Sequence, residues 1–251
     1  MPDNASVNQA FTAQSVHYDA NDRSNRVLTD LRKQVYDHVA KYMQSKSHVL
    51  ELNAGTGIDA SYFVSKGHEV LTTDLSDGMI AELKKKGLKA KQLSYEQLDK
   101  LTGMQFDYVF SNFGGLNCID DLRKVTQHLA PLLRSQSYVT WVIMPKVSPW
   151  ELATIFKGNR NAFRRLKKHG VTAYLEGHHF KTWYHSLKDI KLAFGDKFEF
   201  IESEGLAALS PPPYKTDFRA YGFLRKLDRV VRRIFPFNRW ADHIIVTFRY
   251  K

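Results

Sequence analysis

The chain of 251 residues contains a single cysteine, Cys118, and no long run of apolar residues. One thiol excludes an intrachain disulfide and favours a reducing compartment. No stretch approaches the roughly 18 uninterrupted apolar residues of a membrane-spanning helix, so none is expected. The first residues, Met1–Ser6, are polar and lack the apolar core of a secretory signal. These absences together predict a cytoplasmic location.

Internal repeats, low-complexity runs and zinc-ligand patterns are also missing from the sequence. The adjacent pair His178 and His179 does not complete a metal site by itself, so no metal is expected. The residues that are present are 43% hydrophobic and 13% aromatic, which favours a folded globule over disorder. At this length the chain can bury the core of one catalytic domain.

Positive charge is concentrated in the second part of the chain. Residues 151–251 hold 20 Lys and Arg against 10 Asp and Glu, whereas residues 1–150 hold 17 against 16. A basic surface can attract acidic small molecules, anionic membranes or nucleic acid. A solvated basic face without a specific ligand explains the excess equally well, so the charge leaves the partner open.

The strongest local pattern is an apolar run, Val49–Leu52, followed by Gly55 and Gly57. A second run, Glu69–Asp74, ends in an acid. This order predicts a strand, a glycine-rich turn, a helix and a second strand. The helix would aim its free N–H groups at a ligand, and the carboxylate could accept hydrogen bonds from both hydroxyls of a ribose. The pattern therefore predicts a nucleoside-binding pocket.

Two kinds of nucleoside cofactor fit this pocket. The run from Gly55 to Ala60 satisfies the dinucleotide fingerprint G-x-G-x-x-A, and Asp74 lies where a ribose-binding acid is expected. Against a dinucleotide stands Glu51, because its negative charge would repel a pyrophosphate at the glycine turn. A carboxylate there suits S-adenosylmethionine, which carries a sulfonium and an ammonium group. The glycine turn alone is compatible with both cofactors, and Glu51 favours S-adenosylmethionine over a dinucleotide.

Three segments extend this pattern into a set. Glu51–Gly57 reads Glu-Leu-Asn-Ala-Gly-Thr-Gly, Asp74–Met79 reads Asp-Leu-Ser-Asp-Gly-Met, and Phe106–Asn117 ends in Ser-Asn-Phe-Gly-Gly-Leu-Asn. The set resembles the class I S-adenosylmethionine-dependent methyltransferases over about residues 45 to 145. The resemblance implies an α/β fold of three layers, with a doubly wound, mostly parallel seven-stranded sheet whose last strand is antiparallel. It is specific for fold and cofactor and says little about the substrate.

The resemblance also implies which residues contact the cofactor. S-adenosylmethionine would be bound through its ribose by Asp74 and through its adenine by Met79, and S-adenosylhomocysteine would be the product. The residues implied to contact the cofactor are Tyr18, Glu51, Asn53, Ala54, Gly55, Gly57, Asp74, Leu75, Met79, Ser94, Tyr95, Asn112 and Phe113.

Two positions depart from the family pattern. Asn53 replaces the first glycine of the motif, although asparagine tolerates left-handed backbone better than most residues. Ser94 stands where the family often has an aspartate near the adenine amine. A hydroxyl, a backbone group or Glu96 would then make that contact.

Hydrophobic spacing divides the chain into an N-terminal part, residues 1–44, and a catalytic domain, residues 45–251. Residues 1–12 are predicted to form a loose tail and residues 23–44 a helix. Tyr18 lies in a segment similar to one that closes over the cofactor in many relatives, and packing at a helix start is an equal alternative. Between the fifth and sixth strands, residues 146–197 are predicted to be an insertion that forms the substrate region.

Aromatic and titratable residues are concentrated in this insertion. A hydroxyl acceptor needs a base near neutral pH, whereas an amine needs only to lose its proton. His178 and His185 are candidate bases and Tyr184 a candidate orienting hydroxyl, while a structural role is the usual alternative for each histidine. The predicted reaction is methyl transfer to oxygen or nitrogen, less favourably carbon, of a small acceptor of anionic or lipid-like character. A non-catalytic S-adenosylmethionine-binding protein, an RNA methyltransferase and an NAD-dependent enzyme are the alternatives.

The segment 218–235 combines apolar and basic residues at helical spacing. Such a helix either lies on an anionic membrane or buries its apolar face on the sheet. Nucleic acid is disfavoured as a partner, because Ser111–Phe113 stands where many base methyltransferases carry Asn-Pro-Pro-aromatic. The sequence predicts no oligomeric state. The predicted apolar stripe is Tyr221, Leu224, Leu227, Val231 and Ile234.

Overall fold

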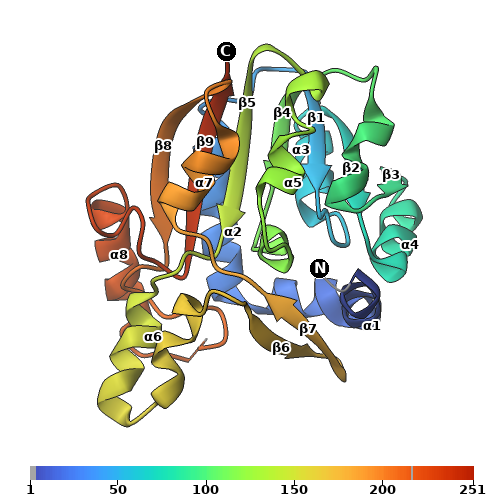
Figure 1. Ribbon diagram of the computed structural model, residues 1–251. Coiled ribbons are helices and arrows are strands. Elements are labelled where there is room, and N and C mark those ends of the chain that lie inside the picture. Colours follow the sequence, from blue (N-terminus) through green and yellow to red (C-terminus); the bar gives the residue numbers. More distant parts are fainter. Residues whose placement is uncertain (1–3, 216) are drawn as a thin grey trace.

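A seven-stranded sheet with helices on both faces organises the fold. The computed structural model describes residues 4–215 and 217–251 (Figure 1). Along the sheet the strands follow the order β3-β2-β1-β4-β5-β9-β8. Their bounds are β1 His48–Leu52, β2 Glu69–Asp74, β3 Lys89–Gln92, β4 Phe106–Ser111, β5 Leu133–Ile143, β8 Phe198–Leu206 and β9 His243–Tyr250.

Strands β3, β2, β1, β4 and β5 run parallel, and β9 runs antiparallel to both of its neighbours. The middle strands β1 and β4 are buried almost throughout, which explains their near-continuous apolar sequence. The chain order reverses between β1 and β4, and open α/β sheets bind ligands beyond the carboxyl ends of the strands at such a point. The predicted sheet with an antiparallel last strand is confirmed.

Two apolar cores hold the helices to the two faces of the sheet. On one face, α2 (Arg26–Val39) and α3 (Ile58–Ser65) bury Leu31 and Phe63 against the strands. On the other, α5 (Arg123–Thr126) and α7 (Leu187–Phe194) cover a core in which Phe194 lies against Trp141. Helix α4 (Asp77–Lys85) covers the β3 edge. Single 3₁₀ turns span Tyr95–Leu101, Gly115–Cys118, Ala130–Leu132, Thr154–Lys157 and Arg160–Leu166.

The N-terminal segment forms a long helix, α1 (Asn4–Ser24). The loose tail predicted for residues 1–12 is therefore wrong for residues 4–12, and residues 1–3 lie outside the described part of the chain. The helix is polar and buries few apolar residues, among them Val7 and Ala10, so its pattern in the sequence is weak. Its stability comes from tertiary contacts with α4 and with the insertion. Asn25 then caps α2 by accepting hydrogen bonds from the next turn.

The chain between β5 and β8 builds a small layer beyond the carboxyl end of the sheet. Ser148 caps α6 (Pro149–Ala153) with proline in the first turn. Strands β6 (Val171–Leu175) and β7 (His178–Thr182) pair only with each other, as an antiparallel hairpin. Figure 1 shows this hairpin beside α1, and α7 returning to the face of the sheet. The insertion and the N-terminal helix thus meet across the end of the sheet.

Helix α8 (Tyr221–Val231) lies at the β8 end of the molecule, on the side away from α4 (Figure 1). Its buried residues are Tyr221, Arg225 and Asp228. Of the predicted apolar stripe, Tyr221 is buried in the core, Leu224 and Val231 are half-buried, and Leu227 and Ile234 are exposed, so the stripe is covered only in part. Within residues 4–215 and 217–251, no helix has the length and apolar character needed to cross a bilayer.

Candidate active site

A cavity of about 360 Å³ lies beyond the carboxyl ends of the parallel strands. Its floor comes from the loops that follow β1, β2 and β4, and its roof from α1 and the β6–β7 hairpin. Gly55 and Asp74 of the nucleoside motif line it together with Phe180 and Tyr184 of the insertion. Two segments that are far apart in the sequence therefore share one space.

Left-handed backbone shapes the loop after β1, where φ is 46° at Asn53, 56° at Gly55 and 83° at Gly57. A Cβ at Gly57 would lie 2.5 Å from Leu88 Cδ1 and 2.6 Å from Leu83 Cδ2, so glycine is required there. At Gly55 no atom lies within 4 Å of the Cβ position. The loop is thus tight against α4 on one side and open towards a ligand on the other.

Asp74 ends β2 with its carboxylate held by two backbone groups. Gly55 N donates to Oδ2 and Ser76 N to Oδ1, both at 2.9 Å. Each oxygen keeps a second lone pair, which suits the two hydroxyls of a ribose. Burial raises the Asp74 pKa to about 6, although these N–H groups act in the opposite direction. The carboxylate is therefore fixed in position and titrates near neutral pH.

The Asn53 side chain occupies the position that glycine leaves empty in the family motif. Its Nδ2 donates to the Asn112 carbonyl at 3.1 Å, and its Oδ1 accepts from Ser111 Oγ at 2.6 Å and from Tyr95 OH at 3.1 Å. A Cβ at Gly115 would lie 2.3 Å from this side chain, so glycine at 115 makes room for it. The amide therefore ties the β1 loop to the end of β4.

Glu51 lies beneath the loop and is almost fully buried. Its Oε2 has no hydrogen-bond partner among the described residues. Burial raises its pKa well above the usual range, Asp59 and Asp74 raise it further, and Arg32 acts against them. Glu51 is thus a buried acid with a raised pKa next to the loop, and it is absent from the cavity wall.

The loop after β4 is held by a buried ion-pair network. Asn112 Nδ2 donates to Asp59 Oδ2 at 2.9 Å, and Arg32 pairs with Asp59 at 2.5 Å and with Asp22 at 2.7 Å. The Arg32 guanidinium lies 4.9 Å from the centre of the Phe113 ring. Asn112 and Phe113 therefore face the cavity from a rigid support.

Most of the predicted cofactor residues lie on the cavity wall. Glu51, Ala54 and Gly57 do not, because they form the buried side of the loop. Those that line the cavity are Tyr18, Asn53, Gly55, Asp74, Leu75, Met79, Ser94, Tyr95, Asn112 and Phe113.

The opposite wall is built by the insertion. Tyr184 and Thr182 line it beside Phe180, and Arg164 adds a positive charge. Burial raises the Tyr184 pKa, so its hydroxyl stays protonated and can donate a hydrogen bond. Arg164 is held in a bidentate pair with Glu151, with both N–O distances 3.0 Å. This wall combines apolar surface with one hydroxyl donor and one guanidinium.

Solved structures with this fold include several methyltransferases. The chain is 13% identical to an S-adenosylmethionine-dependent methyltransferase from Methanosarcina mazei (TM-score 0.59), over 84% of this chain and 96% of that one. It is 16% identical to one from Archaeoglobus fulgidus (TM-score 0.55), over 93% and 99% of the two chains. It is also 16% identical to Burkholderia thailandensis 1,6-didemethyltoxoflavin-N1-methyltransferase with bound S-adenosylhomocysteine (TM-score 0.57), over 100% and 91%. At 13–16% sequence identity, this structural similarity shows only that the fold is shared.

A family model described as "Methyltransferase domain" matches residues 49–136, from β1 into β5. The match includes the glycine loop, Asp74 and the loop after β4. Residues 49–136 are therefore similar to a methyltransferase domain, on a fold shared with S-adenosylmethionine-dependent methyltransferases. A search of curated proteins finds no match to the sequence.

The residues predicted to be catalytic lie at different distances from the cavity. Tyr184 is on the wall, whereas the neighbouring His185 is buried and donates from Nε2 to the Ile119 carbonyl at 3.1 Å. Burial lowers the His185 pKa, so the ring is neutral near pH 7. His178 lies in β7 on the same face as Phe180 but nearer the hairpin turn and outside the wall.

The roof of the cavity contains one aromatic pair, Phe11 and Phe180, that the sequence interpretation missed, beside the predicted Tyr18. Phe11 of α1 meets Phe180 of β7 with ring centres 5.6 Å apart, and both line the cavity. Tyr18 also lines it, and burial raises the Tyr18 pKa to about 12. Asp19 accepts a hydrogen bond from Thr56 in the glycine loop. The apolar spacing of Val7, Ala10, Phe11 and Tyr18 is the signal that could have predicted this helix.

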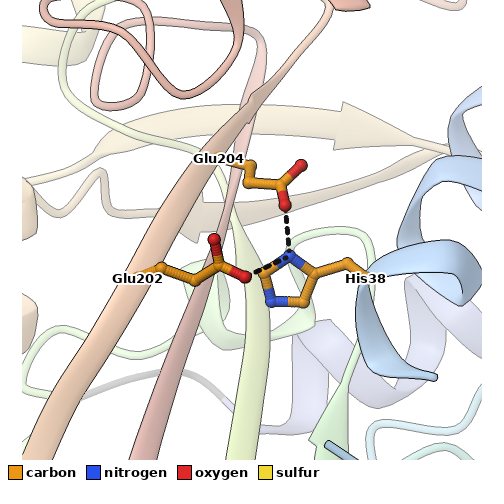
Figure 2. Close-up of side chains that lie close together, drawn as sticks. All are labelled: His38, Glu202 and Glu204. Atoms are coloured by element: carbon orange, nitrogen blue, oxygen red, sulfur yellow. Dashed lines mark hydrogen bonds and ion pairs between the residues drawn. The ribbon is translucent and has the colours of Figure 1, made fainter. Parts of the chain in front are cut away.

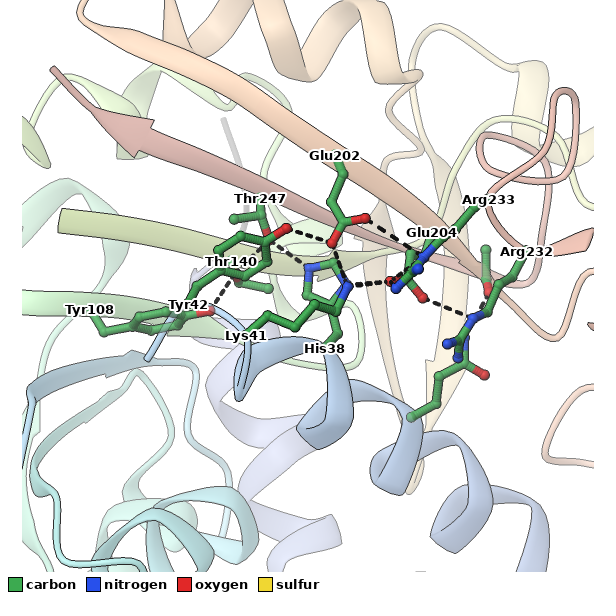
Figure 3. A network of polar contacts seen from close by, with 12 residues as sticks. His38, Lys41, Tyr42, Tyr108, Thr140, Glu202, Glu204, Arg232, Arg233 and Thr247 are labelled. Carbon is green, nitrogen blue, oxygen red and sulfur yellow. Dashed lines mark hydrogen bonds and ion pairs between the residues drawn. The ribbon is translucent and has the colours of Figure 1, made fainter. Parts of the chain in front are cut away.

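A second cluster of polar groups lies away from the cavity, between α2 and β8 (Figure 2). His38 Nδ1 is 2.9 Å from Glu204 Oε1 and 3.7 Å from Glu202 Oε1, a spacing compatible with a metal site. Lys41, Arg232 and Arg233 pair with the same carboxylates (Figure 3). Three cations already balance two carboxylates, so a divalent ion would add surplus positive charge. The cluster fits a structural ion-pair network that joins α2, β8 and the end of α8.

His38 connects this network to the centre of the sheet. Its Nδ1–H donates to Glu204, and its Nε2 accepts from Thr247 Oγ1 at 2.8 Å. Thr247 and Thr140 are joined at 2.8 Å, and Tyr108 OH and Thr140 at 2.6 Å. Burial lowers the His38 pKa although Glu204 acts against it, and ion pairs hold the Glu204 pKa far below its usual range. This chain of hydrogen bonds therefore requires that His38 is neutral and that Glu204 is ionised.

This arrangement predicts that the protein loses stability in mild acid. An unfolded histidine titrates at about 6.5, whereas folded His38 resists protonation. Stability is thus complete above that pH and falls as the pH drops towards the folded pKa, by up to about 1.4 kcal/mol per pH unit. Ionised Glu204 adds a second loss below about 4.5. The measurement is urea unfolding between pH 7.5 and 4.

The matched comparison for this prediction is His38→Gln against His179→Gln, since His179 is exposed on β7. His38→Gln should reduce the slope of stability against pH between 7 and 5. It should not abolish the slope, because burial also lowers the pKa of His68 and His185. Equal slopes in the two variants would contradict the assignment.

Proposed function

We propose that the chain transfers a methyl group from S-adenosylmethionine to an oxygen or nitrogen of a small-molecule acceptor. The observation that carries the proposal is one shared cavity, which Asp74 and Gly55 line on one side and Tyr184 and Arg164 on the other. One space of this size that combines a nucleoside motif with a separate polar and apolar wall suits a cofactor and an acceptor side by side.

The residues on the cofactor side fit S-adenosylmethionine. Asp74 would hold the ribose hydroxyls with its two remaining lone pairs, and Leu75 and Met79 would contact the adenine. The open space at Gly55 lets the ligand approach the backbone. Glu51 has a buried oxygen without a hydrogen-bond partner, so a nearby cation would favour its ionised form. The remaining proposed contacts are Tyr18, Asn53, Ala54, Gly57, Ser94, Tyr95, Asn112 and Phe113.

S-adenosylmethionine supplies a methyl group on a positively charged sulfur. The chain's contribution is to align the acceptor with that group and to exclude water. Phe11 and Phe180 would close the roof over the acceptor. Tyr184 would orient it with a donated hydrogen bond, because its raised pKa keeps the hydroxyl protonated. His185 would act as a positioning residue, since it fixes the Ile119 carbonyl behind the wall.

The acceptor wall favours a flat or apolar molecule with an acidic group. Apolar side chains such as Phe11, Ile119, Met144 and Phe180 form much of it. Arg164 is the cation on the wall, and an acidic group could share its guanidinium with Glu151. An amine acceptor would need no base, whereas a hydroxyl acceptor would be a phenol or acid that loses its proton readily near neutral pH. Transfer to carbon is the less favoured outcome.

Replacement of Tyr184 by phenylalanine tests the acceptor side. We expect kcat to fall about tenfold while the Kd for S-adenosylmethionine stays unchanged, because one orienting hydrogen bond is lost and no cofactor contact is removed. The assay is S-adenosylhomocysteine formation over a panel of phenolic, carboxylate and amine acceptors. Tyr214→Phe is the control, since Tyr214 is exposed and lies outside the cavity wall.

Two outcomes would contradict the proposal. An unchanged kcat in Tyr184→Phe would remove Tyr184 from the acceptor wall. Stoichiometric binding of S-adenosylmethionine without any S-adenosylhomocysteine across the panel would favour a non-catalytic binding protein.

A further inference from the structure

Helix α8 is attached to the rest of the protein by polar contacts. Tyr221 OH donates to Asp30 Oδ2 at 2.7 Å, and Arg225 donates to Gln34 Oε1 at 2.6 Å. Asp228 accepts hydrogen bonds from the backbone N–H groups of residues 209 and 210. These three residues lie one helical turn apart and form the buried side of the helix. A surface helix usually buries its apolar residues, whereas here two of the three buried residues are charged and much of the apolar surface stays exposed.

The opposite side of α8 and the turn after it expose large apolar residues. Val230 is 69% exposed, Phe223 64% and Ile234 55%. The turn adds Phe235, whose ring centre lies 6.2 Å from that of Trp240. Helical spacing brings the residues of α8 into one row. This set, called here the outer apolar face, consists of Phe223, Leu227, Val230, Ile234, Phe235 and Trp240.

Basic residues lie along the outer apolar face. Lys226, Arg229 and Arg233 follow one another at the same helical spacing, next to the apolar row. Arg233 pairs with Glu202 and Glu204. Lys226 and Arg229 are exposed, with no acidic group within 4 Å among the described residues. Residues 215–240 contain eight Lys and Arg against two Asp.

The positive surface continues from Trp240 into a groove. Arg239 and Trp240 line it together with Lys146, Lys188 and Lys191. Burial lowers the Lys191 pKa, and the nearby Arg239 lowers it further. The groove and the outer apolar face therefore form one region with apolar and cationic character.

We propose that the outer apolar face docks on an anionic phospholipid bilayer, with α8 lying in the plane of the interface. Interfacial helices combine an apolar row with Lys and Arg beside it, and tryptophan is enriched at the headgroup level. The cations complement anionic headgroups, and a helix fixed by its polar side can insert its apolar side without leaving the protein. A partner protein or a second copy of the chain is the competing occupant.

Vesicle sedimentation of the full chain tests the proposal without cofactor or acceptor, so its result is independent of the proposed reaction. Two vesicle compositions are needed, phosphatidylcholine alone and phosphatidylcholine with phosphatidylglycerol. We expect binding to the second at low salt, weaker binding as salt is added, and little binding to the first. Vesicle binding that depends on neither the lipid composition nor the salt concentration would overturn the proposal.

Two double variants test separately how the apolar residues and the cations contribute to vesicle binding. Phe223→Gln with Val230→Gln should weaken binding more than about tenfold through lost apolar burial. Lys226→Glu with Arg229→Glu should also weaken it more than about tenfold, because each cation near the surface contributes about a fivefold effect. All four side chains are exposed, so the melting temperature should stay the same.

Matched controls change residues of the same kind elsewhere. Val64→Gln alters an exposed residue of α3, and Lys84→Glu with Lys91→Glu alters the same number of charges near β3. Both controls should bind like the parent protein. Absence of vesicle binding at low salt would overturn the proposal. A dimer of the parent chain that Phe223→Gln with Val230→Gln dissociates would also overturn it and assign the face to a second copy.

Discussion

Replacing Asp74 with alanine is expected to raise the Kd for S-adenosylmethionine at least about 100-fold. The carboxylate is already oriented by Gly55 N and Ser76 N, so it can accept two further hydrogen bonds without rearrangement. Hydrogen bonds to a charged group contribute about 1.5–3 kcal/mol each. Isothermal titration calorimetry measures the effect, and Asp120→Ala, an acid outside the cavity wall, should bind like the parent protein.

The same carboxylate predicts a pH dependence of cofactor binding. Burial raises the Asp74 pKa to about 6 in the free protein. Hydroxyl donors require the ionised form, so affinity should be constant above about pH 7 and fall up to about tenfold per pH unit below 6. Asp74→Asn keeps the size of the side chain and should remove this dependence along with the tight binding. A Kd for the parent protein that stays flat from pH 7.5 to 5 would contradict the role of Asp74.

The cofactor half of the site could be predicted because its signals are local. Gly57 must be glycine since Leu83 and Leu88 fill the space around it, and Asp74 follows a buried strand directly. A strand end, a turn and an acid are close in sequence, so one segment carries most of the geometry. The mostly parallel sheet could be predicted as well, because strands and helices alternate along the sequence.

Glu51 shows the limit of such local patterns. Its position in the motif predicts an acid facing a cationic ligand, but sequence position does not determine which side of a tight loop a side chain occupies. Left-handed backbone at Asn53 and Gly55 turns the loop over it, and the side chain is buried beneath. The backbone conformation separates the residue from the cavity wall.

The acceptor half depends on tertiary contacts that the sequence does not display. Tyr184 and His185 are adjacent, yet one lines the cavity and the other bonds to the Ile119 carbonyl, because the chain leaves β7 just before them. The roof comes from α1, whose polar composition hides its helix. Helix α8 is likewise held by polar contacts with α2 that its apolar spacing does not indicate.

Arg165 holds the insertion to the end of the sheet. Its guanidinium is almost fully buried and donates to Glu151 at 2.8 Å, to the Asp242 carboxylate at 3.0 Å and to the carbonyls of Pro145 and Asp242. It also lies 5.0 Å from the centre of the Tyr184 ring. Burial alone would raise the Asp242 pKa, but His243 and Arg165 hold it below its usual range. Loss of this cation would remove the buried partner that Glu151 and Asp242 share, and would leave them only Arg164 and His243 within the described part of the chain.

Arg165→Met is therefore expected to destabilise the protein by up to about 3–5 kcal/mol, the usual range when one partner of a buried ion pair is removed. For a domain of this size that corresponds to a fall of about 10 °C in melting temperature. Arg164→Ala is the matched control, because Arg164 bonds to the same Glu151 but is half-exposed, and it should cost about 1 kcal/mol or less.

A double-mutant cycle separates the charge effect from lost packing. If buried charge is the cause, neutralising its partner should recover part of the loss, so Arg165→Met with Glu151→Gln should be more stable than the sum of the single changes implies. Additive effects of the two changes would contradict the ion-pair explanation. Because the Arg165 guanidinium lies against Tyr184, the same variant should also lower kcat with the acceptor more than it changes cofactor affinity, which ties the stability of the insertion to the shape of the acceptor wall.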